Sequence, residues 1–268
     1  MLCDLHTHTR FSFDGQCTVA ELCDAALCKG VDILAITEHY DFDTRGGGDH
    51  YKAGEARRAR EMAEAKAFCA PRMELLCGIE LGQPHLWPEK TAAFLAQNDF
   101  DVVIGSLHDL RPEKDIYRDF DYNTLAQCDA VYAQFFDEAE EMLRTCDIDV
   151  FGHYDYPMRL MRTAVPDASL LRWRERMRPF LHSLAHSGIA LEINSSAYRR
   201  WQGRPAGEDW LLQDYLAAGG TRVTVGSDAH KADHVASGIP EACALLRRNG
   251  ISSITVYEKR KPRQVSIL

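Results

Sequence analysis

Histidine and carboxylate side chains stand at two places in the sequence with the spacing of a metal site. His6 and His8 are two residues apart, and Asp228 and His230 repeat that spacing near the end of the chain. Residues two apart on an extended strand point to the same side, so each pair can bind one metal ion. Imidazole and carboxylate ligands together suit zinc, iron or manganese. The two pairs therefore predict a transition-metal site.

Further candidate ligands follow other apolar runs of the sequence. With the two pairs they make a set of six histidines and three acids: His6, His8, His39, His108, His153, His230, Asp14, Glu80 and Asp228. This set exceeds what one ion uses, and two or three ions with positions left for water are typical of a catalytic site. Glu80 can bridge two ions because it has two carboxylate oxygens. A histidine taken alone is more often structural, but the two same-face pairs together favour a metal centre.

Other acids and histidines are not included in the predicted ligand set. Glu38 alternates to the opposite face from its neighbour His39, and we expect it to be a supporting or structural acid. Glu192 lies at the end of an apolar run and could still face the site. The histidines that lack a strand-end context are His50, His85, His182, His186 and His234. The pair four residues apart among them is expected on a half-exposed helix face, because the glutamate of a helical zinc motif is absent.

The elements that must position these residues alternate between short apolar strands and amphipathic helices. This alternation predicts an α/β fold with a parallel sheet and crossover helices. The predicted strands are 2–6, 33–37, 75–79, 102–107, 150–152, 190–193 and 223–226, with 254–257 as an additional strand. The predicted helices are 19–28, 55–69, 91–97, 125–144, 170–186, 210–217 and 240–249. Thr18 and Glu21 have the spacing of a capping box before the first helix.

Two glycine-rich loops mark one rim of the predicted sheet. Residues 46–48 and 203–207 both follow strand ends. In a closed barrel the loops after the strands lie on the same rim, where such folds place their chemistry. The candidate ligands also follow strand ends, so we expect them at that rim.

Length and composition limit the possible partners. The chain has 268 residues, of which 46% are apolar, and fits one large domain. Its 31 basic and 40 acidic side chains give a net charge of −9, so nucleic acid is not an expected partner. The nine cysteines are odd in number and include no C-x-x-C pair, which indicates reduced thiols.

No apolar run approaches the roughly 20 residues of a membrane span, and no targeting segment is recognised. We therefore expect a cytoplasmic protein without membrane contact.

The motifs around the candidate ligands resemble those of the PHP (polymerase and histidinol phosphatase) superfamily. The match runs from residue 4 to residue 230, in the segments DLHTHTRFSFDG (4–15), TEH (37–39), GIE (78–80), GSLH (105–108), GH (152–153) and GSDAH (226–230). More narrowly, the chain resembles the monofunctional histidinol-phosphatase branch. The resemblance implies a distorted (β/α)7 TIM-like barrel. It also implies a single PHP metallophosphoesterase domain over residues 1–268 and a trinuclear metal centre.

The resemblance further implies how the ligands are shared among ions. One ion would be held by His6, His8, Glu80 and Asp228, a second by Asp14, His39 and His230, and a third by Glu80, His108 and His153. Some relatives have histidine where this chain has Asp14, and zinc, iron and manganese all occur in such sites. The residues expected to be catalytic are Glu80, Asp228 and His230.

Two arginines are expected to bind the phosphate of a substrate. Arg159 and Arg199 follow predicted strands and should lie in loops on the catalytic rim, and the arginine fork suits non-bridging phosphate oxygens. In the histidinol-phosphatase branch, arginines at similar places contact the phosphate. Arg162 or Arg200 could take the place of either arginine. Arg111 and Lys114 are alternatives as phosphate contacts or lid residues. Asp43 or Glu192 could be the partner of a substrate amine.

The expected reaction is metal-dependent hydrolysis of a small phosphate monoester. No suitably placed aspartate or cysteine motif offers a nucleophile for a phosphoenzyme, and the resemblance makes L-histidinol phosphate the expected substrate, in histidine biosynthesis. One alternative is a PHP phosphoesterase acting on a nucleotide, a sugar phosphate or phosphotyrosine. Another is an amidohydrolase-type C–N hydrolase, but that class often bridges its metals with a carbamylated lysine where this chain offers Glu80. A third, a metal-stabilised module without activity, is disfavoured because the motif residues are intact.

Overall fold

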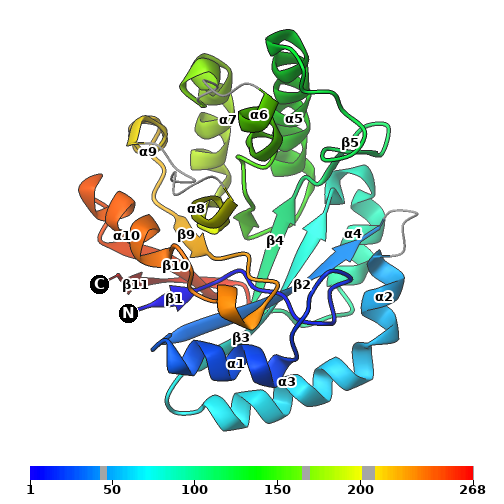
Figure 1. Ribbon diagram of the computed structural model, residues 1–268, viewed down its shortest axis with the longest axis vertical. Helices are drawn as coiled ribbons and strands as arrows, with labels where there is room; N and C mark the ends of the chain where they lie inside the picture. The colour runs from blue at the N-terminus through cyan, green and yellow to red at the C-terminus, as the bar shows by residue number, and fades with distance from the viewer. Residues whose placement is uncertain (43–46, 165–169, 201–208, 268) are drawn as a thin grey trace.

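The computed structural model describes residues 1–42, 47–164, 170–200 and 209–267. Within these residues, seven parallel strands form one sheet with helices around it (Figure 1). In sheet order the strands are β1 (Cys3–Asp4), β2 (Ile33–Asp41), β3 (Glu74–Gly82), β4 (Val102–Ser106), β7 (Val150–Phe151), β8 (Ala190–Asn194) and β9 (Val223–Gly226). The predicted α/β architecture is confirmed.

The two edges of this sheet meet, which makes it a barrel. The N–H of Leu5 donates to the carbonyl of Val225 at 3.0 Å, and the N–H of His8 donates to the carbonyl of Ala229 at 2.8 Å. These bonds join the chain after β1 to the chain around β9. The first and last predicted ligand pairs are therefore brought side by side.

Strands β2 and β3 are longer than the sequence predicted. Each has nine residues, so His39 and Glu80 lie inside strands and not after them. They are directly opposite each other in the parallel register. Every residue of β2 is buried, including its polar ones. The predicted ends at residues 37 and 79 are wrong, because the polar residues that follow are buried and continue the pairing of β2 with β3 to Asp41 and Gly82.

The helices cross over between the strands. The α-helices are α1 (Val19–Cys28), α2 (Gly47–Ala53), α3 (Glu55–Cys69), α4 (Pro88–Leu95), α5 (Leu125–Thr145), α6 (Met158–Ala164), α7 (Arg174–Ser187), α8 (Ser196–Arg200), α9 (Asp209–Ala217) and α10 (Ile239–Arg248). Short 3₁₀ turns are η1 (Pro84–Leu86), η2 (Leu170–Trp173) and η3 (Ala232–His234). Helices α1 and α3 have the predicted bounds. The capping box of α1 is present, with Thr18 Oγ1 accepting from the N–H of Glu21 at 3.1 Å.

Several predicted boundaries need correction. The segment 170–186 divides into η2 and α7, and α4 begins earlier than predicted because Pro88 suits the first turn of a helix. Arg159 and Arg199 lie in helices α6 and α8, not in loops. Of the two glycine-rich loops, residues 47–48 begin α2, whereas residue 46 and residues 203–207 lie outside the described residues.

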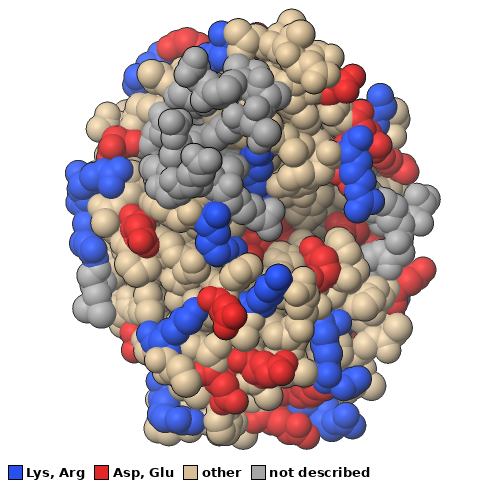
Figure 2. Space-filling view, viewed as in Figure 1, with Lys and Arg blue, Asp and Glu red and all other residues tan. Residues whose placement is uncertain are grey.

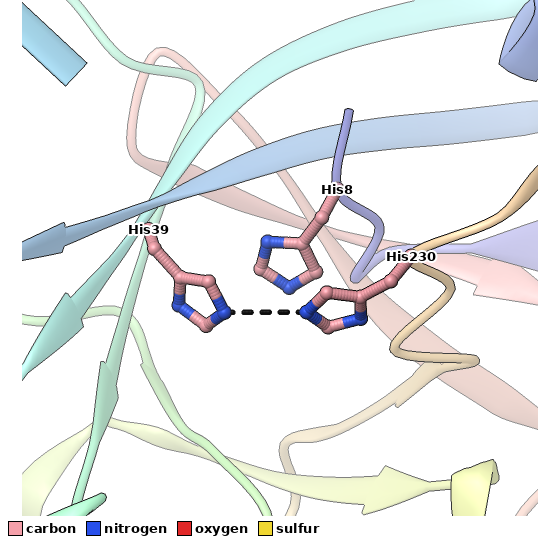
Figure 3. A group of neighbouring side chains, drawn as sticks. All are labelled: His8, His39 and His230. Atoms are coloured by element: carbon pink, nitrogen blue, oxygen red, sulfur yellow. Dashed lines mark hydrogen bonds between the residues drawn. The ribbon is translucent and has the colours of Figure 1, made fainter. Parts of the chain in front are cut away.

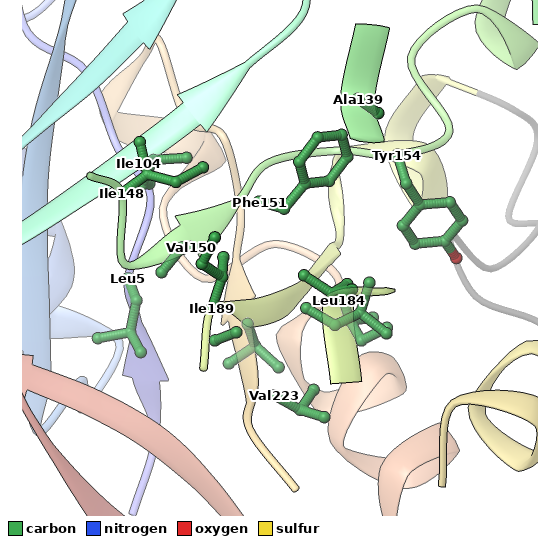
Figure 4. Packing of buried hydrophobic residues seen from close by; sticks show 14 of the residues in the cluster. Leu5, Ile104, Ala139, Ile148, Val150, Phe151, Tyr154, Leu184, Ile189 and Val223 are labelled. Atoms are coloured by element: carbon green, nitrogen blue, oxygen red, sulfur yellow. The ribbon is translucent and has the colours of Figure 1, made fainter. Parts of the chain in front are cut away.

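The core fills the space between the sheet and the helices. Phe151 and Leu184 are fully buried in this core (Figure 4), and the ring of Phe151 packs against the rings of Phe135 and Phe180 from α5 and α7. Burying one such side chain stabilises the fold by about 1.5–3 kcal/mol. This packing holds the strand ends rigidly, which is what a multi-ligand site requires.

The additional strand predicted at 254–257 is present but does not join the barrel sheet. It is β10 (Ser253–Glu258), which pairs antiparallel with β11 (Lys261–Ser266). The guanidinium of Arg260 contacts Asp147 and Asp149 at 2.9 Å, which fixes the hairpin to the chain before β7. The amino group of Met1 donates to the carbonyl of Ser266, so both termini lie together beside β1 (Figure 1). A second small hairpin consists of β5 (Asp109–Leu110) and β6 (Lys114–Asp115).

The surface charges are mixed on the face that Figure 2 shows, and the cysteines are unpaired. Basic and acidic side chains are interspersed over the described residues on the face seen in Figure 2, without a continuous patch of either sign. All nine cysteines are free thiols. Among the described residues, no helix combines the length and the apolar character needed to cross a membrane.

Candidate metal centre

The predicted ligands converge at the carboxyl-terminal end of the barrel strands. Within the described residues, four groups of three side chains have their ligand atoms within 4.8 Å of one another. These groups are His6–His8–Asp228, Glu80–His108–His153, His8–His39–His230 and His39–Asp41–His108. The first two correspond to the first and third predicted ligand sets. The third brings together the histidines of the second set, with His8 beside them.

One oxygen of Glu80 faces three of the histidines. Glu80 Oε2 lies 3.2 Å from His6 Nε2, 3.4 Å from His8 Nε2 and 2.9 Å from His39 Nδ1. All four side chains are buried. The segment after β1 and the strands β2 and β3 thus direct their polar atoms to one point.

The other oxygen of Glu80 faces a different pair of histidines. Glu80 Oε1 lies 2.8 Å from His153 Nε2 and 3.4 Å from His108 Nε2. The hydroxyl of Ser106 donates to this same oxygen at 2.6 Å, which fixes the orientation of the carboxylate. The two oxygens therefore face different ligand groups, as a bridging carboxylate requires.

The environment keeps Glu80 ionised. Burial by itself raises the pKa of this carboxyl, but the neighbouring His6, His39 and His108 outweigh burial and hold the pKa well below its usual range. Glu80 in turn raises the pKa of two of the histidine rings. Burial lowers the pKa of His39, but Glu80 raises it to about 9, and the same balance raises the pKa of His108 to about 10.

Three rings from distant parts of the chain face one another (Figure 3). The centroid of the His8 ring is 4.2 Å from that of His39 and 4.2 Å from that of His230, and the Nε2 atoms of His39 and His230 are 3.3 Å apart. Burial and these two neighbours lower the pKa of His8 well below its usual value. Asp14 Oδ2 lies 3.1 Å from His230 Nε2 and Asp14 Oδ1 lies 3.6 Å from His39 Nε2. The predicted second ligand set is thus assembled at the exposed side of the cluster.

Several ring nitrogens of the cluster have no hydrogen-bond partner although they are buried. They include His6 Nε2, His8 Nε2 and His39 Nδ1. The buried oxygen Glu80 Oε2 also has no hydrogen-bond partner. Buried polar atoms in folded proteins are nearly always hydrogen-bonded, and an ion is one of the explanations for those that are not. Nitrogen and carboxylate donors in this number suit a divalent transition metal. The residues therefore fit a metal centre.

Two of the clustered residues have left-handed backbone conformations. His153 has φ of 21° and Asp228 has φ of 53°. Such conformations in residues other than glycine cost about 1–3 kcal/mol each and concentrate at functional sites. The side chain of Arg199 donates to the carbonyls of Ser227 and Asp228 at 2.7 and 3.2 Å, which supports the strained turn after β9.

Comparison with known proteins agrees with this arrangement. Residues 4–196 match the family model described as the PHP domain. The chain belongs to the PHP domain family. Asp228 and His230 follow the matched range, on the segment that closes the PHP barrel against β1.

The relatives of this PHP domain cover nearly its whole length. The probable histidinol-phosphatase of Thermotoga maritima is 24% identical, over 96% of this chain and 96% of that protein. The histidinol-phosphatase of Lactococcus lactis is 22% identical, over 96% of this chain and 95% of that protein. The crystal structure of histidinol phosphate phosphatase from Lactococcus lactis, complexed with zinc, L-histidinol and phosphate, matches with a TM-score of 0.84 and 21% identity. It covers 97% of this chain and 98% of that chain. The fold is therefore shared.

Arg159 of the PHP domain reaches the rim from α6. Its guanidinium packs over the ring of Tyr156 and lies 3.1 Å from Ser196 Oγ and 3.5 Å from Asp228 Oδ2. Burial by itself lowers the pKa of Arg159, but Tyr117, Asp155 and Asp228 raise it above the usual value. Arg159 is therefore a buried cation beside the candidate ligands.

The other residues considered as substrate contacts lie at different places from Arg159. Arg199 contacts the backbone after β9 and is not among the residues that line the pocket above the cluster. Arg111 forms a two-pronged pair with Glu141 at 2.7 Å, and Lys114 lies near the ring of Phe120, so neither lines that pocket. Asp43 and the side chains of Arg162 and Arg200 lie outside the described residues.

Asp41 is a candidate ligand that the sequence interpretation missed. Its Oδ1 lies 3.8 Å from His108 Nδ1, is buried and has no hydrogen-bond partner. Asp41 follows His39 by two residues on β2, so the same-face rule used for the other pairs would have found it. It was overlooked because β2 was predicted to end at residue 37.

Proposed function

We propose that this PHP domain is a metal-dependent histidinol-phosphatase. It hydrolyses L-histidinol phosphate to L-histidinol and phosphate, a step of histidine biosynthesis in the cytoplasm. The observation that carries the proposal is Glu80, whose two oxygens face separate groups of histidines. The histidinol-phosphatase names of full-length relatives support the choice of substrate.

We further propose that the whole chain acts as one catalytic domain with two or three divalent ions. The proposed ligands are those predicted above: His6, His8, Asp14, His39, Glu80, His108, His153, Asp228 and His230. Zinc is the first choice because the Lactococcus enzyme was crystallised with it, and iron and manganese suit the same donors.

The side chains have distinct parts in the proposed reaction. Bound divalent ions supply Lewis acidity and lower the pKa of water near phosphorus. The guanidinium of Arg159 donates two N–H hydrogen bonds to the phosphoryl oxygens and stabilises the charge that develops on them. Asp228 lies between this arginine and the histidines, with Oδ2 3.5 Å from Arg159 and Oδ1 3.4 Å from His230 Nδ1. It therefore holds the phosphate-binding cation in register with the ligands.

The pocket above the cluster supports a cationic aromatic substrate. Away from the ligands its walls include Phe13, Asp109, Asp115, Tyr117 and Tyr156. Carboxylates and aromatic rings are complementary to an amine and an imidazole. Arg118 also lines the pocket and pairs with Asp115 at 3.6 Å. Because aromatic rings also stack on nucleobases, the choice of histidinol phosphate over a nucleotide depends on the names of the full-length relatives.

The direct test is phosphate release after metal removal and reconstitution. Chelator-treated protein should be inactive, and zinc, iron or manganese should restore hydrolysis. We expect kcat/KM for L-histidinol phosphate to exceed the values for AMP, glucose 6-phosphate and phosphotyrosine by about a hundredfold, because analogues leave polar pocket groups unpaired. Equal rates over the panel would favour a less specific phosphoesterase, and hydrolysis unaffected by chelation would contradict the metal proposal.

Zinc affinity is expected to rise with pH. In the metal-free protein the pKa values of His39 and His108 are raised to about 9 and about 10, so below these values each ring is an imidazolium with protons on both nitrogens. A metal must displace those protons, which costs about tenfold in affinity per pH unit for each proton. Titration with a competing chelator should therefore show tighter binding from neutral pH up to about 10. A flat profile would remove these two rings from the ligand set.

A further inference from the structure

His6 and His8, in the segment after β1, each have Nδ1 linked to a buried carboxylate, directly for His6 and through a hydroxyl for His8. His6 Nδ1 lies 2.6 Å from Glu192 Oε1. Glu192 is 1% exposed and comes from β8, which is not adjacent to β1 in the sheet. The contact therefore passes through the interior of the barrel, on the side of the ring away from Glu80.

The other partners of Glu192 fix the direction of that hydrogen bond. Glu192 Oε2 accepts from the N–H of His153 at 2.7 Å and from Nδ2 of Asn194 at 3.3 Å. All of these contacts supply N–H donors to an ionised carboxylate, which only accepts. His6 therefore donates from Nδ1, and its Nε2 is the ring atom that faces Glu80 Oε2, 3.2 Å away.

His8 reaches a carboxylate through one hydroxyl. His8 Nδ1 lies 3.1 Å from Ser12 Oγ, which donates its only proton to Glu38 Oε2 at 2.5 Å. The backbone N–H of His39 also donates to Ser12 Oγ, at 2.9 Å. A hydroxyl has one proton and two lone pairs, so Ser12 accepts from His8. His8 is thereby left with a free Nε2, the atom that faces Glu80 and Asp228.

Glu38 itself is fixed in place. Its carboxylate accepts from the N–H of Thr9 at 3.1 Å and from the hydroxyl of Thr9 at 2.5 Å. Glu38 is 1% exposed and comes from the central strand β2. It therefore gives Ser12 a rigid acceptor.

We propose that Glu192 and the Ser12–Glu38 pair are positioning residues that orient the two rings of the H-x-H pair for metal binding. Each contact occupies Nδ1 and leaves Nε2 as the ring atom that faces the proposed metal centre. The opposite tautomer would place an N–H at the ion and prevent coordination. Glu192 also holds the strained backbone of His153, so one carboxylate supports ligands on both sides of Glu80. This inference rests on the metal centre of the proposed function.

Zinc affinity of Glu192→Gln tests the proposal, with Glu138→Gln as the matched control. Glu138 is also a buried carboxylate that contacts a histidine, His85, at 2.8 Å, but it lies outside the cluster. We expect Glu192→Gln to bind zinc about 10–100-fold more weakly than the parent in a chelator competition. Glu138→Gln should bind zinc like the parent. Equal affinities in the parent and Glu192→Gln, or equal losses in both variants, would overturn the role of Glu192.

Two further measurements keep the test valid if Glu192→Gln folds poorly. Long-range ¹H–¹⁵N spectra of the zinc-loaded parent should show His6 and His8 protonated on Nδ1 and bound through Nε2. Ser12→Ala should weaken zinc binding and change the His8 signals while leaving those of His6. Nδ1 coordination of either ring in the parent would overturn the inference alone. A parent that binds no zinc would instead contradict the proposed function.

Discussion

Glu80→Ala should lose the bound metal and at least about 10³-fold of the phosphatase activity while the barrel stays folded. Glu80 is the acid that both halves of the cluster face, at 2.9 Å from His39 Nδ1 and 2.8 Å from His153 Nε2. Without it no carboxylate would bridge the proposed ions, and the surrounding histidines would lose the anion that orders them. The measurements are zinc content after gel filtration, phosphate release from L-histidinol phosphate, and thermal unfolding.

Glu80→Gln separates charge from shape in the same experiment. The amide keeps the volume of the side chain and can still accept from Ser106, but it cannot bridge two cations. We therefore expect the activity of Glu80→Gln to resemble that of Glu80→Ala, with a smaller change in stability. A variant that retains full metal content and full turnover would refute the assignment of the centre.

The sequence predicted which residues come together at the strand ends. His6 with His8, and Asp228 with His230, could be paired by the two-residue period of a strand, although the structure places both pairs in the segments just after β1 and β9. Glu80 could be predicted as a bridge because a carboxylate has two oxygens, and these two oxygens face different histidines. Periodicity also gave the bounds of α1 and α3, whose apolar stripes pack on the sheet.

The parts that the sequence did not predict depend on which strands become neighbours. Glu192 was considered as a partner for a substrate amine, but it accepts from His6 across the closed barrel. Asp41 was missed because the length of β2 is set by pairing with β3, not by its own apolar pattern. The helical position of Arg159 likewise arises from the turn that follows His153.

Arg159 is expected to have the second largest effect on catalysis. Arg159→Ala should lower kcat/KM by about 10²–10³-fold with zinc content unchanged, because its charge stabilises the phosphoryl oxygens and it is not a metal ligand. Arg159→Lys keeps the charge without the two-pronged geometry and should recover only part of the loss. Steady-state kinetics on L-histidinol phosphate with parallel zinc analysis measures both effects.

Arg199→Ala is the comparison variant for Arg159→Ala. The guanidinium of Arg199 donates to the carbonyls of Ser227 and Asp228, whereas Arg159 lines the pocket. Arg199→Ala should therefore loosen the turn that carries Asp228 and lower zinc retention along with activity. If Arg199→Ala instead raises KM at full zinc content, Arg199 contacts the phosphate as its sequence position predicted. If Arg159→Ala leaves kcat/KM unchanged, the phosphate does not bind at the α6 side of the rim.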